Sequence, residues 1–509
     1  MPKAAKVSLL GQPSNQMRRL ASRDCVPVRF RRSRSSLWCG LTLWYNADMK
    51  NNFGIFHLYD IRGKYPDEFT EKDAHAIGHG FVNYLKTVRP KKQYTVAVGY
   101  DSRSSSPVLF GEFTKALCEE GCNVIDIGLI TSPMLYFAVS HYTYDAGAMV
   151  TASHNPNPYN GLKLTREKAI PFDGDNGIFW IRDYILQHGN SHPEPLLFKG
   201  SITEKNIEDD YVAFNMQLAE VEADEFKGMR LALDAGNGTG GPVAMKILEQ
   251  VGVSVEPLCI EPDGTFPNHV PDPLILENLH DLIALMKQYT FHLGVALDGD
   301  ADRIIFVDEK GAPVSGDIIT ALMSKILLGE GKDVANERFL YDIRSSNVVR
   351  ETIETAGGIP VEYRIGHALI KKKMREESIL FGGELSGHYY WGNNIFFETP
   401  FVVLLKILKE LQNTRVPFSE LLTSFRKYYH SGEINFQVED KEAKIKQLQE
   451  LYEREGKVSL LDGLRVDFPN WWFLVRPSNT ESVLRLVIEA DSFDALEERK
   501  RELTKLITQ

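Results

Sequence analysis

The chain has 509 residues, of which 43% are hydrophobic and 25% are charged, and its formal net charge is −11. This length predicts a globular protein of three or four domains, and no apolar run approaches the roughly 18 residues of a membrane span. The acidic balance disfavours general nucleic-acid binding, because phosphate backbones bind basic surfaces. Five scattered cysteines form no CxxC pair, which favours a reducing, cytoplasmic location.

The first 48 residues differ in charge from the rest of the chain. They hold nine Lys and Arg against two Asp, a net of +7, so the remaining body carries −18. An Arg-rich transit peptide is one interpretation, and a secretory signal fits poorly because the apolar stretch 37–45 is late and interrupted. We favour a third interpretation, translation from Met49, and expect the basic leader 1–52 to be disordered or dispensable.

Three stretches of the body repeat a pattern of apolar strands and helical segments. The expected strands are 95–101, 122–128 and 146–150, then 231–236, 253–259 and 293–297, then 339–342, 360–365 and 379–381. Helices are expected at 242–251 and 346–356. Strands that alternate with helices predict βαβ units and mainly parallel sheets. A smaller α+β unit follows residue 428 and ends in a helix at 492–507. The predicted domains are 53–200, 201–310, 311–427 and 428–509.

A serine follows the last strand of the first copy. Ser153 lies in the segment 151–156 (TASHNP), where Pro156 and Pro158 stop any regular structure. A serine on such a turn presents its hydroxyl outward, as a covalent nucleophile or a phosphate carrier does. The alternative is a polar turn whose Ser and Asn make local hydrogen bonds.

Three carboxylates follow the last strand of the second copy. Asp298, Asp300 and Asp302 alternate in a glycine-containing loop, and such oxygen ligands suit Mg²⁺. A solvated acidic turn is the alternative. Ligands of open α/β sheets bind beyond the carboxyl ends of the strands. We therefore expect the three copies to direct their loops toward one site.

Two further polar loops carry candidate ligand groups. The loop 383–388 (GELSGH) offers donors and acceptors suited to sugar hydroxyls, with a glycine-rich turn as the alternative. The loop 476–482 (RPSNTES) resembles a phosphate cradle, with a polar hairpin as the alternative. His367 is equally compatible with binding and with capping or packing of its helix. The lysines 371–373 are typical of a solvated helix face.

Four ordered motifs together identify a resemblance: 151–156 (TASHNP), 298–303 (DGDADR), 383–388 (GELSGH) and 476–482 (RPSNTES). Two further segments support it: 59–63 (YDIRG) and 266–279 (FPNHVPDPLILENL). The chain from residue 53 onward resembles the α-D-phosphohexomutase family, most closely its phosphomannomutase/phosphoglucomutase type. The resemblance implies an α/β fold of three similar domains with mixed, mainly parallel sheets, and a C-terminal α+β phosphatase-like domain, around a central cleft.

The resemblance also implies roles for individual residues. Catalytic roles fall to Ser153, which would carry a phosphoryl group, and to His154, Arg62, Lys163, Arg303 and His388. Mg²⁺ would be bound by Ser153, Asp298, Asp300 and Asp302. The substrate would be bound by Tyr59, Arg344, His367, Glu384, Ser386, His388, Arg476, Ser478, Asn479 and Thr480. Whether Lys163 or His388 is the general base stays open.

The implied reaction moves a phosphoryl group between C6 and C1 of a hexose phosphate through a hexose 1,6-bisphosphate, which also serves as activator. Within the family, Ser-Gly-His in the sugar loop is typical of members that accept both mannose and glucose phosphates; we expect mannose phosphates as the preferred substrates and glucose phosphates as a second activity. The alternatives are a phosphoglucosamine mutase, a metal-dependent sugar phosphatase and a silent sugar-phosphate binder. We expect small-molecule hexose phosphates as partners, without nucleic acid or membrane, and a monomer or weak homo-oligomer.

Overall fold

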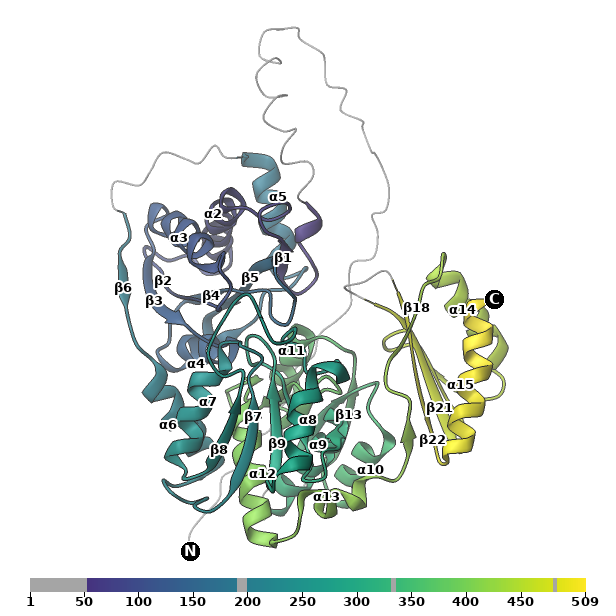
Figure 1. Ribbon diagram of the computed structural model, residues 1–509. Coiled ribbons are helices and arrows are strands. Elements are labelled where there is room, and N and C mark those ends of the chain that lie inside the picture. The colour runs from purple at the N-terminus through teal and green to yellow at the C-terminus, as the bar shows by residue number, and fades with distance from the viewer. Residues whose placement is uncertain (1–52, 190–198, 331–335, 479–482) are drawn as a thin grey trace, which may run out of the picture. The chain divides into compact units, whose positions relative to one another are not determined.

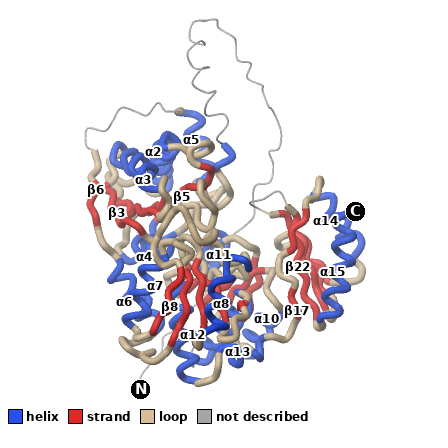
Figure 2. Tube along the Cα trace, in the orientation of Figure 1, coloured by secondary structure: helices blue, strands red, loops and turns tan. Residues whose placement is uncertain are grey.

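The computed structural model describes residues 53–189, 199–330, 336–478 and 483–509 (Figure 1). The predictions made for the leader 1–52 and for Asn479 and Thr480 lie outside these ranges. Helices and strands alternate from residue 53 to about residue 428, and a β-rich unit with two long helices follows (Figure 2). None of the helices in the described ranges combines the length and apolar composition that crossing a bilayer requires.

Three of the four sheets share one topology. In the second sheet β7 (Arg230–Asp234) pairs in parallel with β8 (Ser254–Leu258) and β9 (Leu293–Leu297). The strand β10 (Ile304–Val307) then adds antiparallel to β9, and the edge strand β11 (Pro313–Val314) adds antiparallel to β10. A parallel centre with an antiparallel edge confirms the prediction of mixed sheets.

The third sheet repeats this order and the first extends it. The third runs β13 (Ile359–Tyr363), β12 (Arg338–Asp342), β14 (Phe381–Gly383), β15 (Tyr389–Trp391) and β16 (Phe397–Glu398). The first runs β1 (Ile61–Lys64), β5 (Tyr159–Arg166), β4 (Ala146–Val150), β2 (Thr95–Tyr100), β3 (Asn123–Leu129) and β6 (Ile202–Glu204). The three predicted copies are therefore structural repeats.

Apolar helix faces bury these sheets in two main cores. One lies between the first sheet and α2 (Glu71–Val88), α3 (Ser106–Glu119) and α5 (Ile178–His188). The larger core joins the other helices α4 (Ser132–His141), α6 (Glu208–Ala219), α7 (Gly240–Gln250), α9 (Gly316–Gly329) and α12 (Pro400–Thr414). Because the larger core is continuous across the first three domains, burial of apolar surface stabilises them as a joint body.

Further helices of the first three domains complete the described part of the chain. They are α8 (His280–Gln288), α10 (Asn347–Thr355), α11 (His367–Glu377) and α13 (Phe418–Leu421). Local sequence sets the helix ends: Thr70 and Asp73 form a capping box at the start of α2, and Thr131 caps α4. These caps satisfy backbone N–H groups that have no partner inside the helix.

The C-terminal unit has a different topology. Its antiparallel sheet runs β17 (Tyr429–His430), β22 (Leu484–Ala490), β21 (Trp471–Pro477), β20 (Leu464–Asp467) and β19 (Lys457–Ser459), and β18 (Ile434–Phe436) also pairs with β22. The helices α14 (Lys441–Tyr452) and α15 (Phe493–Thr508) lie on one face of this sheet (Figure 1). The predicted smaller α+β unit with a C-terminal helix is confirmed.

Candidate active site

The same junction of each repeated sheet carries a polar loop. Each loop leaves the carboxyl end of a parallel strand and enters the first antiparallel strand of its sheet. Ser153 lies between β4 and β5, Asp298 follows β9 and leads to β10, and Glu384 follows β14 and leads to β15. Direct contacts of the aspartate loop with the other two loops show that they meet. The expectation that three copies direct their loops to one site is therefore met by the structure.

Ser153 is buried on a strained turn. Its φ is 51°, in the left-handed region that non-glycine residues seldom adopt, and its side chain is among the buried polar ones. Its backbone N–H donates to the Thr151 hydroxyl at 2.9 Å. Strain of this kind persists only where surrounding contacts enforce it, and it often marks a functional position.

Arg103 supplies those contacts. This buried guanidinium donates to the carbonyl oxygens of Ser153 at 2.8 Å, Asn155 at 2.5 Å and Tyr159 at 3.0 Å, and its Nε donates to Asp101 at 3.0 Å. The fork of one arginine thus fixes the backbone of the whole serine loop. The sequence analysis missed Arg103, and the polar segment DSRSSS that follows the first strand was the available signal.

The serine loop touches the aspartate loop directly. The Ser153 hydroxyl donates to Asp298 Oδ2 at 3.3 Å and lies 3.0 Å from Nδ1 of His154. A Cβ added at Gly299 would lie 2.6 Å from the Ser153 carbonyl oxygen, so only glycine permits this approach. Burial, followed by the charges of Arg303 and Arg62, holds the pKa of His154 well below its usual range. His154 is therefore a neutral neighbour of the serine.

Three buried carboxylates converge beside Ser153. Asp298, Asp300 and Asp302 place one oxygen each within 4.8 Å of one another, and all three residues are buried. Burial and the charges of Asp302 and Asp300 raise the pKa of Asp298 well above its usual range. Asp300 Oδ1 finds no hydrogen-bond partner among the described residues. An all-oxygen site with one unpartnered acceptor and excess negative charge fits a hard divalent cation.

Lys163 and Ser132 hold the aspartates from the first domain. Lys163, on β5, places Nζ 2.5 Å from both Asp300 Oδ2 and Asp302 Oδ2. Burial alone would lower the pKa of Lys163, but the two carboxylates raise it well above its usual range, so the amine is charged. The Ser132 hydroxyl, at the start of α4, donates to Asp300 at 2.5 Å. Ser132 was not predicted, because no pattern near it in the sequence refers to residue 300.

Two further predicted cations lie around this centre. Arg303 is 3.9 Å from Asp298 and 3.6 Å from Asp272, and its Nε lies 3.5 Å from His388 Nε2. Arg62 donates to the Asn155 side chain at 2.5 Å. The structure thus brings both predicted arginines to the two loops that meet at Ser153.

The third loop reaches the aspartates through His388. His388 Nε2 lies 3.1 Å from Asp302 Oδ1, and its Nδ1 lies 3.0 Å from the Ser386 hydroxyl. Glu384 is buried and accepts a hydrogen bond from the Tyr390 hydroxyl at 2.5 Å. Three predicted sugar ligands therefore lie together, next to the metal-binding candidates.

Arginines from two domains share one carboxylate at the junction with the C-terminal unit. Glu433 lies 3.3 Å from Arg344 Nη1, 3.2 Å from Arg485 Nη1 and 3.9 Å from Arg476 Nη1. Arg344 is also bound by Asp342, and Asp342, Glu433 and Glu384 raise its pKa despite its burial. Arg344 and Arg476 were predicted, whereas Glu433 and Arg485 were missed. Ser478 is half-buried at the end of the described part of this loop.

Tyr59 and His367 lie together at the start of α11. Their rings are 5.9 Å apart, and the Tyr59 hydroxyl and His367 Nδ1 both lack hydrogen-bond partners among the described residues. Burial raises the pKa of Tyr59 to about 12, and burial followed by the charge of Lys371 holds the pKa of His367 well below its usual range. Two neutral, unpartnered polar groups beside Glu384 and Arg476 are compatible with ligand binding.

The interpretation of lysines 371–373 as a solvated helix face was wrong for Lys371. Its side chain is fully buried and its Nζ lies 2.6 Å from Glu398 Oε2, which is also fully buried. The same ammonium group lies 3.8 Å from the centroid of the Tyr136 ring. Burial is the largest effect on Lys371 and lowers its pKa. Lys372 is exposed, as expected.

Family models match the chain along most of its length. Models of phosphoglucomutase/phosphomannomutase alpha/beta/alpha domains I, II and III match residues 54–190, 209–311 and 315–429. The model of the C-terminal domain of the same family matches residues 433–506.

Relatives of known description are similar over nearly their whole length. A phosphomannomutase of Methanocaldococcus jannaschii is 36% identical over 455 residues, which cover 89% of this chain and 97% of the relative. A phosphomannomutase/phosphoglucomutase of Pseudomonas aeruginosa is 35% identical over 455 residues, with coverage of 88% and 94%. The crystal structure of a phosphoglucomutase/phosphomannomutase family protein from Burkholderia thailandensis has a TM-score of 0.78 at 30% identity, with coverage of 89% and 96%.

Proposed function

Because the chain belongs to the phosphoglucomutase/phosphomannomutase family of isomerases, we propose that it moves a phosphoryl group reversibly between C6 and C1 of a hexose phosphate. The observation that carries the proposal is the contact of the Ser153 hydroxyl with Asp298, inside a cluster of three carboxylates. A simple hydrolase needs the serine and the carboxylate beside it, but it does not need the arginines that flank Glu433. Their presence favours a mutase over the sugar phosphatase alternative.

Ser153, in this proposal, is the phosphoryl carrier. The bond between its Oγ and phosphorus breaks as the free sugar hydroxyl oxygen bonds to phosphorus; the hydroxyl proton passes to a basic group, and the released Ser153 Oγ takes up a proton. The product is a hexose 1,6-bisphosphate, which turns around in the site. Its other phosphoryl group then returns to Ser153 Oγ, which gives up its proton to a basic group, and the released sugar oxygen takes up a proton. The number of phosphoryl groups is unchanged over the cycle.

Asp298, Asp300 and Asp302 would hold Mg²⁺ together with an oxygen of the phosphorylated Ser153. The ion supplies positive charge that offsets the carboxylates and polarises the transferring phosphoryl group. A phosphoserine carries about −1.5 to −2 of charge, so three carboxylates and a phosphate need further cations. Lys163, Arg303 and Arg62 provide them from β5, the aspartate loop and β1. His154, neutral beside Ser153 Oγ, orients that oxygen.

Lys163 and His388 are the two groups placed to move the proton. Lys163 lies against Asp300 and Asp302, and His388 lies against Asp302 from the sugar loop. Because the Lys163 amine is charged, it supplies positive charge and a proton for the released oxygen, and His388 is the group that accepts the proton of the sugar hydroxyl in this proposal. Comparison of Lys163→Met and His388→Gln in the two reaction directions separates their roles.

Substrate binding follows from the positions of the other polar groups. Glu384, Ser386 and His388 would bind the sugar hydroxyls, and Tyr59 and His367 would contribute the polar atoms that lack partners. The phosphate that does not react would bind Arg344 and Arg476, together with Ser478, Asn479 and Thr480. A cradle of arginines and hydroxyls recognises phosphate rather than the ring, which lets the sugar bind in two orientations.

Mannose phosphates are the proposed preferred substrates, with glucose phosphates second. The Ser-Gly-His sequence of the sugar loop and the relatives described as phosphomannomutase support this choice. A coupled assay of mannose 1-phosphate, glucose 1-phosphate and glucosamine 1-phosphate tests it, each with and without the matching 1,6-bisphosphate. Turnover of the mannose and glucose compounds that the bisphosphate stimulates is expected. Phosphate release without isomerisation would indicate a phosphatase, and a preference for glucosamine 1-phosphate would indicate a phosphoglucosamine mutase.

A further inference from the structure

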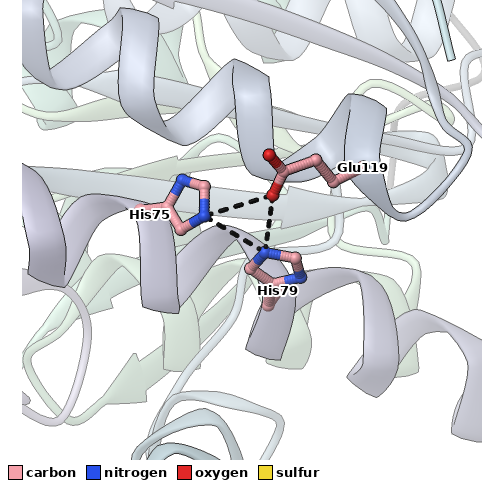
Figure 3. A group of neighbouring side chains, drawn as sticks. All are labelled: His75, His79 and Glu119. Carbon is pink, nitrogen blue, oxygen red and sulfur yellow. Dashed lines mark hydrogen bonds and ion pairs between the residues drawn. The ribbon is translucent and has the colours of Figure 1, made fainter. Parts of the chain in front are cut away.

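A second group of metal-ligating side chains lies on the helices of the first domain, away from the aspartate loop. His75 and His79 are one turn apart on α2, and Glu119 is the last residue of α3. The two imidazole rings and the carboxylate point toward one another across the gap between the helices (Figure 3). The His79 side chain is 3% exposed and those of His75 and Glu119 are 19% and 26% exposed, so the group is open to solvent on one side.

The spacing of the three ligand atoms matches one face of a tetrahedral metal site. His75 Nε2 lies 3.3 Å from His79 Nε2, Glu119 Oε2 lies 3.2 Å from His75 Nε2, and it lies 3.1 Å from His79 Nε2. A tetrahedral Zn²⁺ with bonds of about 2.0–2.1 Å has ligand atoms about 3.3–3.4 Å apart. An ion slightly above this triangle would therefore bond to all three atoms with little movement.

The outer nitrogens of both rings face hydrogen-bond acceptors. His79 Nδ1 lies 2.9 Å from Glu120 Oε1, and Glu120 is itself paired with Lys86. His75 Nδ1 lies 3.2 Å from the carbonyl oxygen of Glu112 and 3.2 Å from its carboxylate. Acceptors at this position hold the proton on Nδ1 and direct the Nε2 lone pair inward, as the outer partners of metal-bound histidines do.

This arrangement is unfavourable for neutral rings without a cation. With both protons on Nδ1, two nitrogen lone pairs and a carboxylate oxygen face one another within 3.3 Å. Three acceptors at that distance repel, and only additional protons or a metal ion compensates them. One further proton on either Nε2 would compensate the group by donation to Glu119 or to the other ring, and a metal ion would take the place of this proton.

We propose that His75, His79 and Glu119 form a Zn²⁺ site with a water molecule as the fourth ligand. Two nitrogens and one oxygen suit Zn²⁺, whereas Mg²⁺ prefers oxygen ligands and an octahedral arrangement. The ion would join the end of α3 to the first turns of α2, and these helices pack on the core beneath Ser153's sheet. Its role is to fix this helix pair, independently of the aspartate site and of the mutase reaction.

Calorimetric titration of the chelator-treated, dialysed full chain with Zn²⁺ tests the proposal. Excess Mg²⁺ is present throughout to occupy the aspartate site. The wild type is expected to bind one equivalent of Zn²⁺. His75→Gln and Glu119→Gln should each weaken binding by about 100-fold, because each removes one of three protein ligands. His280→Gln, which changes a histidine paired with Asp281 on the surface, should bind as the wild type does.

The visible absorption of bound Co²⁺ gives a second measurement of metal binding, and it does not depend on the folding stability of the variant. Tetrahedral Co²⁺ absorbs visible light far more strongly than octahedral Co²⁺, so the wild type and His280→Gln should become coloured and His75→Gln should not. Mutase turnover of His75→Gln with Mg²⁺ should equal that of the wild type, which shows that the variant is folded. Equal Zn²⁺ affinity of wild type and His75→Gln would overturn the proposal. Loss of Zn²⁺ in His269→Gln alone would also overturn it, by placing the ion at Asp234, Cys259 and His269.

Discussion

The Glu433 carboxylate lies 3.3 Å from the Arg344 guanidinium, across the junction between the third α/β domain and the C-terminal unit. Arg476 and Arg485 approach the same carboxylate. In the proposed binding mode, the phosphate of the substrate competes with Glu433, since phosphate binds the same guanidinium groups. The carboxylate keeps three arginines together, and on this proposal it would release Arg344 and Arg476 when a sugar phosphate binds.

Replacing Glu433 by Gln should therefore strengthen binding of the substrate. We expect the KM for mannose 1-phosphate to fall about fivefold, equivalent to the ~1 kcal/mol of a modest ion pair. Steady-state kinetics at several salt concentrations measure the effect. Glu362→Gln is the matched control, because Glu362 pairs with Arg465 at the same junction but outside this arginine group. A tenfold rise in KM for Glu433→Gln would contradict competition between Glu433 and phosphate. It would show that Glu433 holds the arginines in the positions that bind the substrate.

Removal of one carboxylate tests the proposed metal site. Asp300→Asn should lower kcat by at least about 100-fold and raise the Mg²⁺ concentration needed for half-maximal activity, because a ligand charge is lost. Chelation should abolish turnover by the wild type, and added Mg²⁺ should restore it. Asp308→Asn changes another buried carboxylate of the same domain and should keep the Mg²⁺ dependence of the wild type. Unchanged Mg²⁺ dependence of Asp300→Asn would exclude the aspartate loop as the metal site.

Arg103 acts on the reaction through the backbone of the serine loop. Arg103→Lys keeps the charge but loses the fork that reaches four carbonyl oxygens. Displacement of Ser153 by such a change should lower kcat by about 10–100-fold with little change in KM. Kinetic analysis combined with the phosphorylation level of Ser153 measures this. A rise in KM at unchanged kcat would show that Arg103 affects binding and not positioning.

Histidine 269 gives a pH-dependent prediction. Hydrogen bonds with Asp234 and then Cys259 raise its pKa to about 10 from 6.5. Because the folded state binds the His269 proton more tightly than the unfolded state, this proton stabilises the fold. The stabilisation is complete below pH 6.5 and is lost as the pH rises toward 10. His269→Gln should thus be less stable than the wild type by about 1–2 kcal/mol at pH 6, because solvent screens the His269 side chain, which is 17% exposed. Denaturant melts from pH 6 to 10 should show the difference shrinking, and a constant difference would contradict the assignment.

The features of the fold and of the site that depend on a local sequence pattern could be predicted. Strand and helix alternation gave the three repeated domains, and the polar loops after β4, β9 and β14 gave Ser153, the aspartates and Glu384. Contacts between distant residues escaped prediction. Arg103 binds a loop 50 residues away, Glu433 meets Arg344 from another domain, and Lys371 is buried because Glu398 is beside it. A single sequence shows a charged residue but does not show the partner that makes its burial favourable.

The central claim is that Ser153 carries the transferred phosphoryl group. Intact-mass and peptide mass spectrometry of the enzyme after incubation with hexose 1,6-bisphosphate, combined with turnover of Ser153→Ala, tests it most directly. The account predicts one phosphoryl group on Ser153 of the active enzyme, none on Ser153→Ala, and loss of at least about 1000-fold in isomerisation by the variant. An active enzyme without a phosphoryl group on Ser153, or full isomerisation by Ser153→Ala, would contradict it.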